Sequence, residues 1–388
     1  MLKVRELIER MRENEAKLSV FNAIRCLGTG TVSQIEERVR LSRPTILKYV
    51  GELVNEGFLI EKGQGKSSGG RPPKLLSLNP SAAFSIGIDF GAPNLTVALI
   101  DLGKRVLDRA MIPTRLEDPP SAVASRMVDA IREIASGNGV PLERIVGAAV
   151  GVPCFIERET QLLKPIPRLP HWEDVPLKAM VERNFDFPVF TEVGPHLMVL
   201  GEREFGEEKA DNMLYIHVRE GIGMGIFVDG RLVKGWREDA GEIGHTVVSP
   251  GGPRCICGRR GCLEVFSSEP AILKRGRELM KRDDITALDL FRMAEEGEEV
   301  AREVIGEAVD YLVIALVNAI ELFDPEVVVL GGNIVEGGDF ALERIRRGLK
   351  EHRIGEDRVK VRFSKLGIYA GALGAANFAL EKAFEPPC

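Results

Sequence analysis

The sequence predicts an α/β protein of two similar lobes behind a smaller, mostly helical domain. Apolar residues recur at helical spacing through residues 1–60, whereas strands and helices alternate from Phe84 onward. A strand, a glycine-containing turn and a second strand begin at Ser85 and again at Met213. Because the same start occurs twice, we expect two α/β lobes around a cleft.

Residues 1–80 predict a winged helix-turn-helix domain, in which two helices meet at a tight turn and a β-hairpin follows. The first helix of this unit is expected over residues 17–26, where apolar residues have helical spacing. A short helix is expected over residues 31–39, with Ser33 as its N-cap and Glu36 three residues later. The alternative for the whole domain is a helical packing module that binds no DNA.

A second, longer helix is expected after the turn that contains Ser42 and Pro44, because serine caps a helix and proline fits its first turn. Gly57 is expected to end this helix. Its inner face is expected to hold Ile46, Val50, Leu53 and Val54. Strands over residues 58–60 and 75–78 would form the wing.

The N-terminal end of this second helix is expected to enter the major groove of DNA. The side chains at that end are Arg43, Thr45, Lys48 and Tyr49. Basic side chains there could contact guanine edges or phosphates, and the threonine a thymine methyl group. The alternative for each is an ordinary solvated helix residue. Arg71 lies between glycines and prolines and is expected in the minor groove, although such a segment could also be a rigid linker.

Charge is unevenly distributed along the chain, whose net charge is −6. Residues 1–80 hold 14 Lys and Arg against 9 Asp and Glu, a net charge of +5. The remaining residues hold 38 against 49, a net charge of −11. A basic front on an acidic body indicates that only the front faces a polyanion, expected to be double-stranded operator DNA.

The sequence indicates a cytoplasmic protein without a membrane segment. The first residues mix charges and contain no apolar signal core. The longest apolar run, Tyr311–Ile320, is too short to span a bilayer and is expected to be a buried helix. The six cysteines suggest no disulfide framework, which favours a reducing compartment.

Three cysteines and one histidine predict a metal site. His245 is followed by Cys255, Cys257 and Cys262 within a short stretch. Three thiolates and an imidazole are a complete tetrahedral ligand set for a structural Zn²⁺ ion. Two glycines before Cys262 permit a sharp turn, which would bring its thiol to the other ligands. The alternative is a redox-inert loop whose cysteines are incidental.

These residues resemble the signature of the ROK family of sugar kinases and repressors. The signature comprises the Glu-Ile-Gly-His tetrad ending at His245, the three-cysteine loop, and the Gly-Cys-Leu-Glu run ending at Glu264. The likeness covers residues 84–380. Together with the front domain, it makes the chain look like the repressor branch of the family.

The resemblance implies an actin-like ATPase fold, which is ribonuclease H-like, with two lobes. The DNA-binding domain would comprise residues 1–80 and the ROK sugar-binding domain residues 81–388. Within the latter, one lobe would hold about 81–193 together with 370–388. The other lobe would hold about 194–369, and the sugar would bind between the lobes.

The resemblance also implies that Glu242, His245 and Glu264 bind sugar hydroxyls. A carboxylate can accept hydrogen bonds from two adjacent hydroxyls, which fits this role. His245 would bind zinc through one ring nitrogen and face the sugar with the other. Zinc would then hold the sugar-side loop in shape without acting as a catalyst.

One departure from the family pattern indicates that kinase activity is lost. ROK kinases carry Glu-Asn-Asp-Ala-Asn where this chain reads Glu-Val-Gly-Pro-His over residues 192–196. Gly194 therefore stands at the position of the catalytic aspartate, and it has no carboxylate to take the proton of the attacking hydroxyl. Glu192 and His196 are close in sequence, but neighbouring residues point elsewhere. We expect no catalytic residue.

The phosphate-binding and sugar-binding patterns also depart from the family. In the first phosphate loop, Pro93 replaces a hydroxyl residue, and in the second Glu220 puts negative charge where ATP phosphates would lie. Cys154 and Arg168 occupy positions where the family commonly has glycine and asparagine. An acidic sugar, a disaccharide or a xyloside would suit these changes.

The sequence as a whole predicts a sugar-responsive transcriptional repressor that binds a palindromic operator as a homodimer and needs no ATP. A sugar effector would change the hinge between the lobes and lower DNA affinity. The rival is an ATP-dependent sugar kinase of the glucokinase or N-acetylglucosamine kinase type. A bifunctional or purely assembly role is the third possibility.

Overall fold

The computed structural model describes residues 4–64, 72–91, 93–115, 117–164, 172–352 and 359–386. They form two compact units. The first unit consists of Met1–Gly151, Pro176–Thr191 and Ala375–Cys388, and the second of Val152–Val175 and Glu192–Gly374. Arg71 and Arg168, which the sequence singled out, lie outside the described residues.

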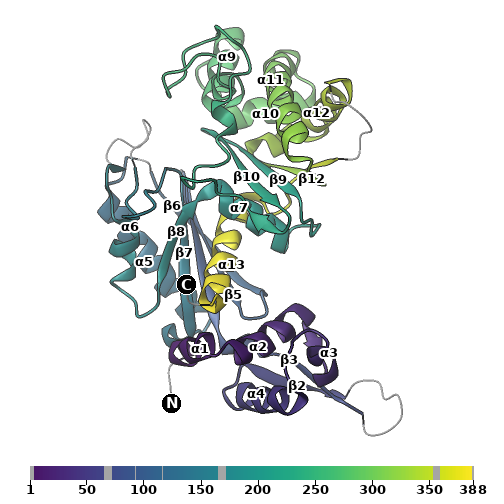
Figure 1. The fold of residues 1–388 in the computed structure, drawn as a ribbon. Coiled ribbons are helices and arrows are strands. Elements are labelled where there is room, and N and C mark those ends of the chain that lie inside the picture. Colours follow the sequence, from purple (N-terminus) through teal and green to yellow (C-terminus); the bar gives the residue numbers. More distant parts are fainter. Residues whose placement is uncertain are drawn as a thin grey trace. The chain divides into compact units, whose positions relative to one another are not determined.

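The first unit begins with four helices and a small sheet, drawn in purple and blue in Figure 1. These elements are α1 (Val4–Arg12), α2 (Glu15–Leu27), β1 (Thr29–Gly30), α3 (Val32–Glu36), α4 (Arg43–Asn55), β2 (Leu59–Gln64) and β3 (Lys74–Leu78). The strands pair antiparallel in the order β1-β3-β2. The predicted helices and hairpin strands are therefore present, whereas β1 had no recognised sequence signal.

Helix α4 begins and ends as its sequence predicts. The Ser42 side chain accepts a hydrogen bond from the Thr45 N–H at 3.4 Å, and Pro44 occupies the first turn. Gly57 follows the helix with a φ of 83°, a conformation that glycine adopts without strain. The fully buried residues of α4 are Ile46, Val50 and Leu53. Val54 is only half-buried, so the predicted inner face was one residue too wide.

The N-cap of α3 is Thr31, and the prediction of Ser33 was wrong. The Thr31 side chain accepts from the Gln34 N–H at 3.4 Å, and the Gln34 side chain accepts from the Thr31 N–H at 2.9 Å. Thr31 with Gln34 and Ser33 with Glu36 have the same capping-box spacing. Because the helix begins at Val32, only the first pair can cap it.

A five-stranded sheet forms the centre of the first unit. Its strands are β4 (Phe84–Phe90), β5 (Asn94–Asp101), β6 (Val106–Pro113), β7 (Ile145–Val152) and β8 (Val189–Val193). They lie in the order β6-β5-β4-β7-β8, with β4 antiparallel to β5 and parallel to β7. Helices α5 (Pro120–Gly137) and α6 (Leu177–Glu182) pack against each other, and α5 packs on β5 and β6.

The second unit contains a sheet with the same strand order. Its strands are β9 (Met213–Val218), β10 (Ile222–Val228), β11 (Arg231–Leu232), β12 (Val327–Gly332) and β13 (Lys360–Phe363). They lie in the order β11-β10-β9-β12-β13, with the first strand again central, antiparallel to the second and parallel to the fourth. The duplicated start therefore did predict two related α/β sheets.

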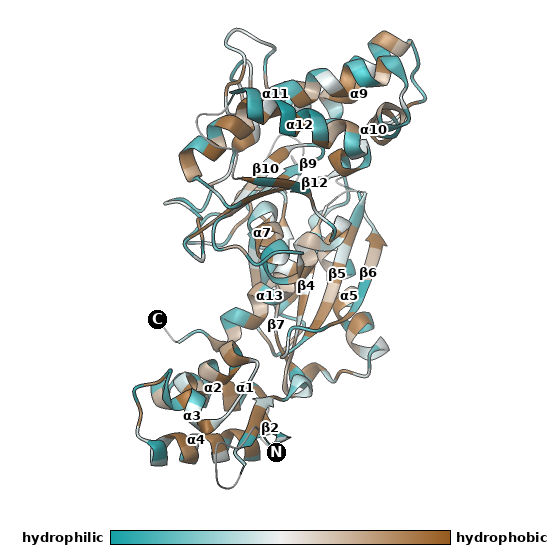
Figure 2. Ribbon diagram, turned by 90° about the vertical axis from the view of Figure 1, so that its right-hand side faces the viewer, coloured by the Kyte–Doolittle hydropathy of each residue, from teal (hydrophilic) through white to brown (hydrophobic). Residues whose placement is uncertain are grey.

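Seven helices of the described chain belong wholly or partly to the second unit. They are α7 (Gly194–Phe205), α8 (Glu264–Ser267), α9 (Glu269–Met280), α10 (Ala287–Glu296), α11 (Glu299–Phe323), α12 (Gly338–His352) and the start of α13 (Ala370–Phe384). Figure 2 shows strands β9, β10 and β12 largely in brown, the colour of hydrophobic residues. Both faces of such a sheet must be covered, and buried apolar clusters lie on each.

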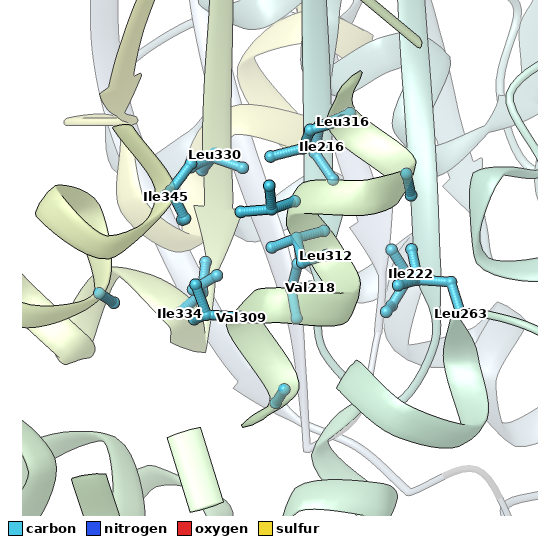
Figure 3. Close-up of a cluster of buried hydrophobic side chains, with 14 of the residues drawn as sticks. Ile216, Val218, Ile222, Leu263, Val309, Leu312, Leu316, Leu330, Ile334 and Ile345 are labelled. Atoms are coloured by element: carbon cyan, nitrogen blue, oxygen red, sulfur yellow. The ribbon is translucent and has the colours of Figure 1, made fainter. Parts of the chain in front are cut away.

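Helix α11 supplies much of the apolar core of the second unit. Figure 3 shows Leu312 and Leu316 of this helix beside Ile216 and Val218 of β9, and all four are at most 1 % exposed. The apolar run within this helix was predicted to be buried, and most of it is, although the Ile314 side chain is 41 % exposed. No helix among the described residues, α11 included, is long and apolar enough to cross a membrane.

The end of α13 is part of the core of the first unit. The Phe384 ring stacks on Phe21 of α2 at a centroid distance of 4.7 Å and meets Phe58 edge-on at 6.4 Å. Nearby, Arg25 of α2 forms an ion pair with Glu381 of α13 at 3.0 Å. The last turn of the chain's final helix therefore anchors the N-terminal helices.

Phe384→Ala should weaken this anchor. The side chain is 1 % exposed, and removing a buried phenyl ring costs about 3–5 kcal/mol. Urea unfolding followed by circular dichroism should show this loss in the transition that includes the N-terminal helices. Leu322→Ala, at a side chain 79 % exposed, is the control and should change stability by less than about 0.5 kcal/mol. Equal effects of the two variants would contradict the assigned packing.

Candidate functional site

The four predicted metal ligands converge in the second unit. His245 ends a short 3₁₀ turn, Ile243–His245, and the three cysteines follow in the next loop. One potential ligand atom from each of the four residues lies within 4.8 Å of the others. The Cys255 Sγ lies 3.6 Å from the His245 Nδ1, and the Cys257 Sγ lies 3.6 Å from the Cys262 Sγ. Tetrahedral zinc with bonds of about 2.0–2.3 Å separates its ligands by about 3.5–3.8 Å, so the group fits one such ion.

Backbone hydrogen bonds shape the cysteine loop. The Gly261 carbonyl accepts from the N–H groups of Val248 and Ser249 at 2.9 and 3.2 Å. Gly261 itself has a φ of 71°, and a Cβ there would lie 1.8 Å from the Ser249 carbonyl oxygen. Only glycine fits at this close approach, and the turn it makes delivers the Cys262 thiol to the cluster.

The thiols differ in how readily they ionise. Burial raises the pKa of Cys262 to about 12. Burial also acts on Cys257, but hydrogen bonds from Arg259 outweigh it and lower the pKa of that thiol to about 7. A metal ion binds thiolates and releases their protons, so metal binding at this cluster is expected to depend on pH.

The three predicted sugar-binding residues flank the metal ligands. The His245 Nδ1 faces the cysteines, while its Nε2 lies 3.9 Å from a Glu242 carboxylate oxygen. Glu264 begins α8 two residues after Cys262 and is 8 % exposed. The structure thus gives His245 the two-sided arrangement that the sequence suggested, while sugar binding itself remains a prediction.

Glu242 is partly exposed, and the pKa of its carboxyl group is raised. Its side chain keeps 43 % of its surface exposed. Desolvation by the surrounding protein, followed by repulsion from Asp239 and Glu264, raises the pKa of Glu242 to about 7. A carboxyl group with acidic neighbours and one open side is suited to hydrogen bonding with neutral hydroxyls.

A buried charge network, which the sequence did not reveal, lies beside position 194. The Glu192 carboxylate contacts the Lys234 ammonium group and lies 3.0 Å from the His196 Nδ1. The His196 Nε2 lies 2.9 Å from the Ala240 carbonyl oxygen. Burial favours neutral Glu192, but the His196 hydrogen bond and the Lys234 charge outweigh it and lower the pKa of this carboxyl.

The same network occupies the two groups considered as replacements for the missing base. Gly194 begins α7 and is buried. The Glu192 and His196 side chains, 3 % and 0 % exposed, are bonded to each other and to the segment that carries Lys234 and Ala240. Lys234 could not have been recognised beforehand, because it lies far from Glu192 in sequence and follows no motif.

The predicted DNA-contacting residues differ in exposure and in their contacts within the domain. The exposed face of α4 carries Arg43 and Lys48, whose side chains are 54 % and 65 % exposed. Arg43 forms an ion pair with Glu36 at 2.8 Å, and Thr45 hydrogen-bonds to Ser42 at 2.7 Å. The Tyr49 hydroxyl instead accepts a hydrogen bond from Asn14 at 3.3 Å, within the domain. Arg71 lies outside the described residues.

Comparison with known proteins gives the family. The family model described as "ROK family" matches residues 85–382. The chain belongs to the ROK family. Its mixed α/β fold, with two sheets of equal strand order, is the ROK fold.

Among ROK proteins, similarity to regulators extends furthest along the chain. The xylose repressor of Caldicellulosiruptor bescii is 31 % identical over 370 residues, covering 92 % of each chain. A crystal structure of a ROK family transcriptional regulator, a homologue of the E. coli MLC protein, has a TM-score of 0.81 at 26 % identity and covers 96 % of each chain. The glucokinase of Halalkalibacterium halodurans is 30 % identical, but the match covers 94 % of the glucokinase and only 76 % of this chain.

Cys257→Ser should remove one metal ligand and with it most of the bound metal. The protein as purified is expected to contain about one zinc ion per chain, and this variant well under half of that, by elemental analysis. Cys154→Ser is the matched control, because that thiol is buried in the same unit but lies outside the cluster. Full zinc content in Cys257→Ser would contradict the four-ligand site.

Proposed function

We propose that this chain is a sugar-responsive, DNA-binding transcriptional regulator that represses carbohydrate-utilisation genes. The observation that carries the proposal is the extent of the matches. The regulators match almost the whole chain, whereas the glucokinase leaves about a quarter of it unmatched. A sugar kinase needs no DNA-binding domain, whereas a transcriptional regulator does.

In this proposal, residues 1–80 act as a winged helix-turn-helix domain on double-stranded operator DNA. Helix α4 would enter the major groove with Arg43, Thr45 and Lys48 at its N-terminal end. The exposure of the two basic side chains and the net charge of +5 on this domain support the assignment. Tyr49 would help to hold the helix in place within the domain, through its hydrogen bond with Asn14. Arg71 would reach the minor groove.

Glu242, His245 and Glu264 would bind the effector sugar. All three lie beside the metal cluster, and the two carboxylates can accept hydrogen bonds from sugar hydroxyls. A structural Zn²⁺ ion held by His245, Cys255, Cys257 and Cys262 would fix the loop that carries these side chains. A sugar that contains xylose is the first candidate, because the relatives that match nearly the full chain include xylose repressors.

Loss of kinase activity follows from the residues at and around position 194. A glycine there supplies no proton acceptor, and the buried Glu192 and His196 are held in their own network. Regulation without ATP is then a matter of two conformations with different DNA affinity, of which the sugar prefers one. We further propose a cytoplasmic homodimer, since a two-fold protein matches a palindromic operator.

Lys48→Ala should weaken DNA binding by the full-length protein. Selection from a random duplex library should first yield a palindromic site, and binding to it can be followed by fluorescence anisotropy. Loss of one phosphate contact should reduce affinity about three- to tenfold and lower the slope of log affinity against log salt by about one. Lys360→Ala, 69 % exposed in the second unit, should have no effect. Unchanged affinity in Lys48→Ala, or recovery of no preferred duplex, would contradict the proposed DNA-reading face.

Sugar-dependent release of ADP should be absent. Kinases turn over at about 1–100 per second, and removal of the general base costs about two to four orders of magnitude. A coupled assay with xylose, glucose and N-acetylglucosamine should therefore stay at the ATP-only background, with a ROK glucokinase as the positive control. Turnover in the ordinary kinase range would contradict a purely regulatory role.

A further inference from the structure

One aromatic side chain of the second unit is held in solvent. Trp236 is 85 % exposed, whereas the only other tryptophan, Trp172, is 0 % exposed. No large apolar side chain among the described residues is more exposed than Trp236. No described residue forms a hydrogen bond or a ring contact with its indole. An indole in water leaves apolar area of about 150–250 Å² uncovered, which a folded protein normally buries.

The loop that carries this indole, Lys234–Gly241, is closed and fixed at its base. The Ala240 N–H donates to the Lys234 carbonyl oxygen at 3.0 Å, which joins the two ends. The Lys234 ammonium group contacts buried Glu192, and the Ala240 carbonyl accepts from buried His196 at 2.9 Å. Both ends are therefore attached to a charge network whose acid and imidazole are at most 3 % exposed.

The loop leads directly into the proposed sugar-binding residues. Gly241 has a φ of 103°, and a Cβ there would lie 1.9 Å from the Met224 carbonyl oxygen, so this end is pinned to β10. Next comes Glu242. Asp239, in the second half of the loop, precedes Glu242 by only three residues.

Charged groups surround the indole on the same loop. Arg237, 74 % exposed, forms an ion pair with Asp239 at 3.4 Å, and Glu238 lies 3.9 Å from Arg158. These charged neighbours in sequence interrupt any larger apolar patch, which a protein partner would need. A flat apolar surface with hydrogen-bonding groups at its rim instead matches a sugar ring, which has C–H groups on its faces and hydroxyls at its edge.

We propose that Trp236 is a second sugar subsite, which stacks on a ring linked to the sugar held by Glu242, His245 and Glu264. The effector is then a glycoside of at least two rings, not a free monosaccharide. The inference rests on the proposed sugar binding by those three residues. The fixed base of the loop means that the indole is already in place, so little ordering entropy opposes stacking. Arg237 and Glu238 are available for the hydroxyls of the second ring.

The test compares a monosaccharide with its disaccharide on the full-length, zinc-containing protein. Calorimetric titration with xylose and xylobiose, and with glucose and cellobiose as a second pair, gives the ratio of affinities. In the wild-type protein, the disaccharide of one pair should bind at least about tenfold more tightly than the monosaccharide. Trp236→Ala should bring that ratio to about one and change monosaccharide affinity less than about twofold. Trp236→Tyr, which keeps a stacking ring, should retain part of the preference.

The fluorescence of Trp236 distinguishes stacking on a sugar from a purely structural role of this side chain. In Trp172→Phe, Trp236 is the sole tryptophan. Its emission should be that of a solvent-exposed indole and should shift to shorter wavelength, with slower quenching by iodide, when the disaccharide is added. The monosaccharide should leave it unchanged. Emission already characteristic of a buried indole in the free protein would mean that another part or copy of the chain covers Trp236, and would overturn the proposal.

A further variant separates failure of this inference from failure of the proposed function. Glu264→Gln should abolish binding of both the monosaccharide and the disaccharide. If it does so while Trp236→Ala keeps the full disaccharide preference, the subsite is wrong and the sugar site stands. If wild-type protein binds none of the four sugars, the proposed sugar site and the subsite built on it are both contradicted.

Discussion

The orientation of one imidazole ring is the constraint on which this site depends. The His245 Nδ1 faces three thiols and its Nε2 faces the Glu242 carboxylate, so whatever fixes the ring on one side also fixes its contact on the other. Glu264 follows the metal ligand Cys262 by two residues at the start of α8. Both carboxylates proposed to bind sugar therefore lie next to proposed metal ligands, Glu242 by contact and Glu264 by sequence. A metal ion bound there would help to fix the positions of these side chains.

The stretch that resembles the catalytic run of the family has a different use in this chain. A buried carboxylate needs compensating charge, and Glu192 finds it in Lys234, while the His196 Nδ1 lies within hydrogen-bonding distance at 3.0 Å. Removing one member would leave uncompensated charge in the core, so the network should be kept or lost as a unit. The network has a structural role, because it fixes the loop before Glu242 to α7. The stretch Glu192–His196 thus holds a loop in place in this chain.

Much of this structure could be predicted from sequence because its signals are local. The cap at Ser42, the strands β4 and β9, and the cluster ending at Cys262 depend on neighbouring residues, and all were correct. The cap of α3 failed because two capping boxes overlap and only the helix start distinguishes them. The Glu192 network could not be predicted because its members come from segments that lie far apart in sequence and meet only in the folded chain. The stacking of Phe384 against the N-terminal helices was missed for the same reason.

The central claim is that sugar occupancy and DNA binding oppose each other in one chain. By linkage, a sugar that lowers DNA affinity must itself bind less tightly to the DNA complex, by the same factor. The most direct measurement is DNA affinity of the full-length protein at increasing concentrations of a sugar whose binding has been established by calorimetry. The account predicts a fall of about five- to 150-fold that saturates, with an equal fall in sugar affinity when DNA is bound. DNA affinity that stays constant up to saturating sugar would contradict it.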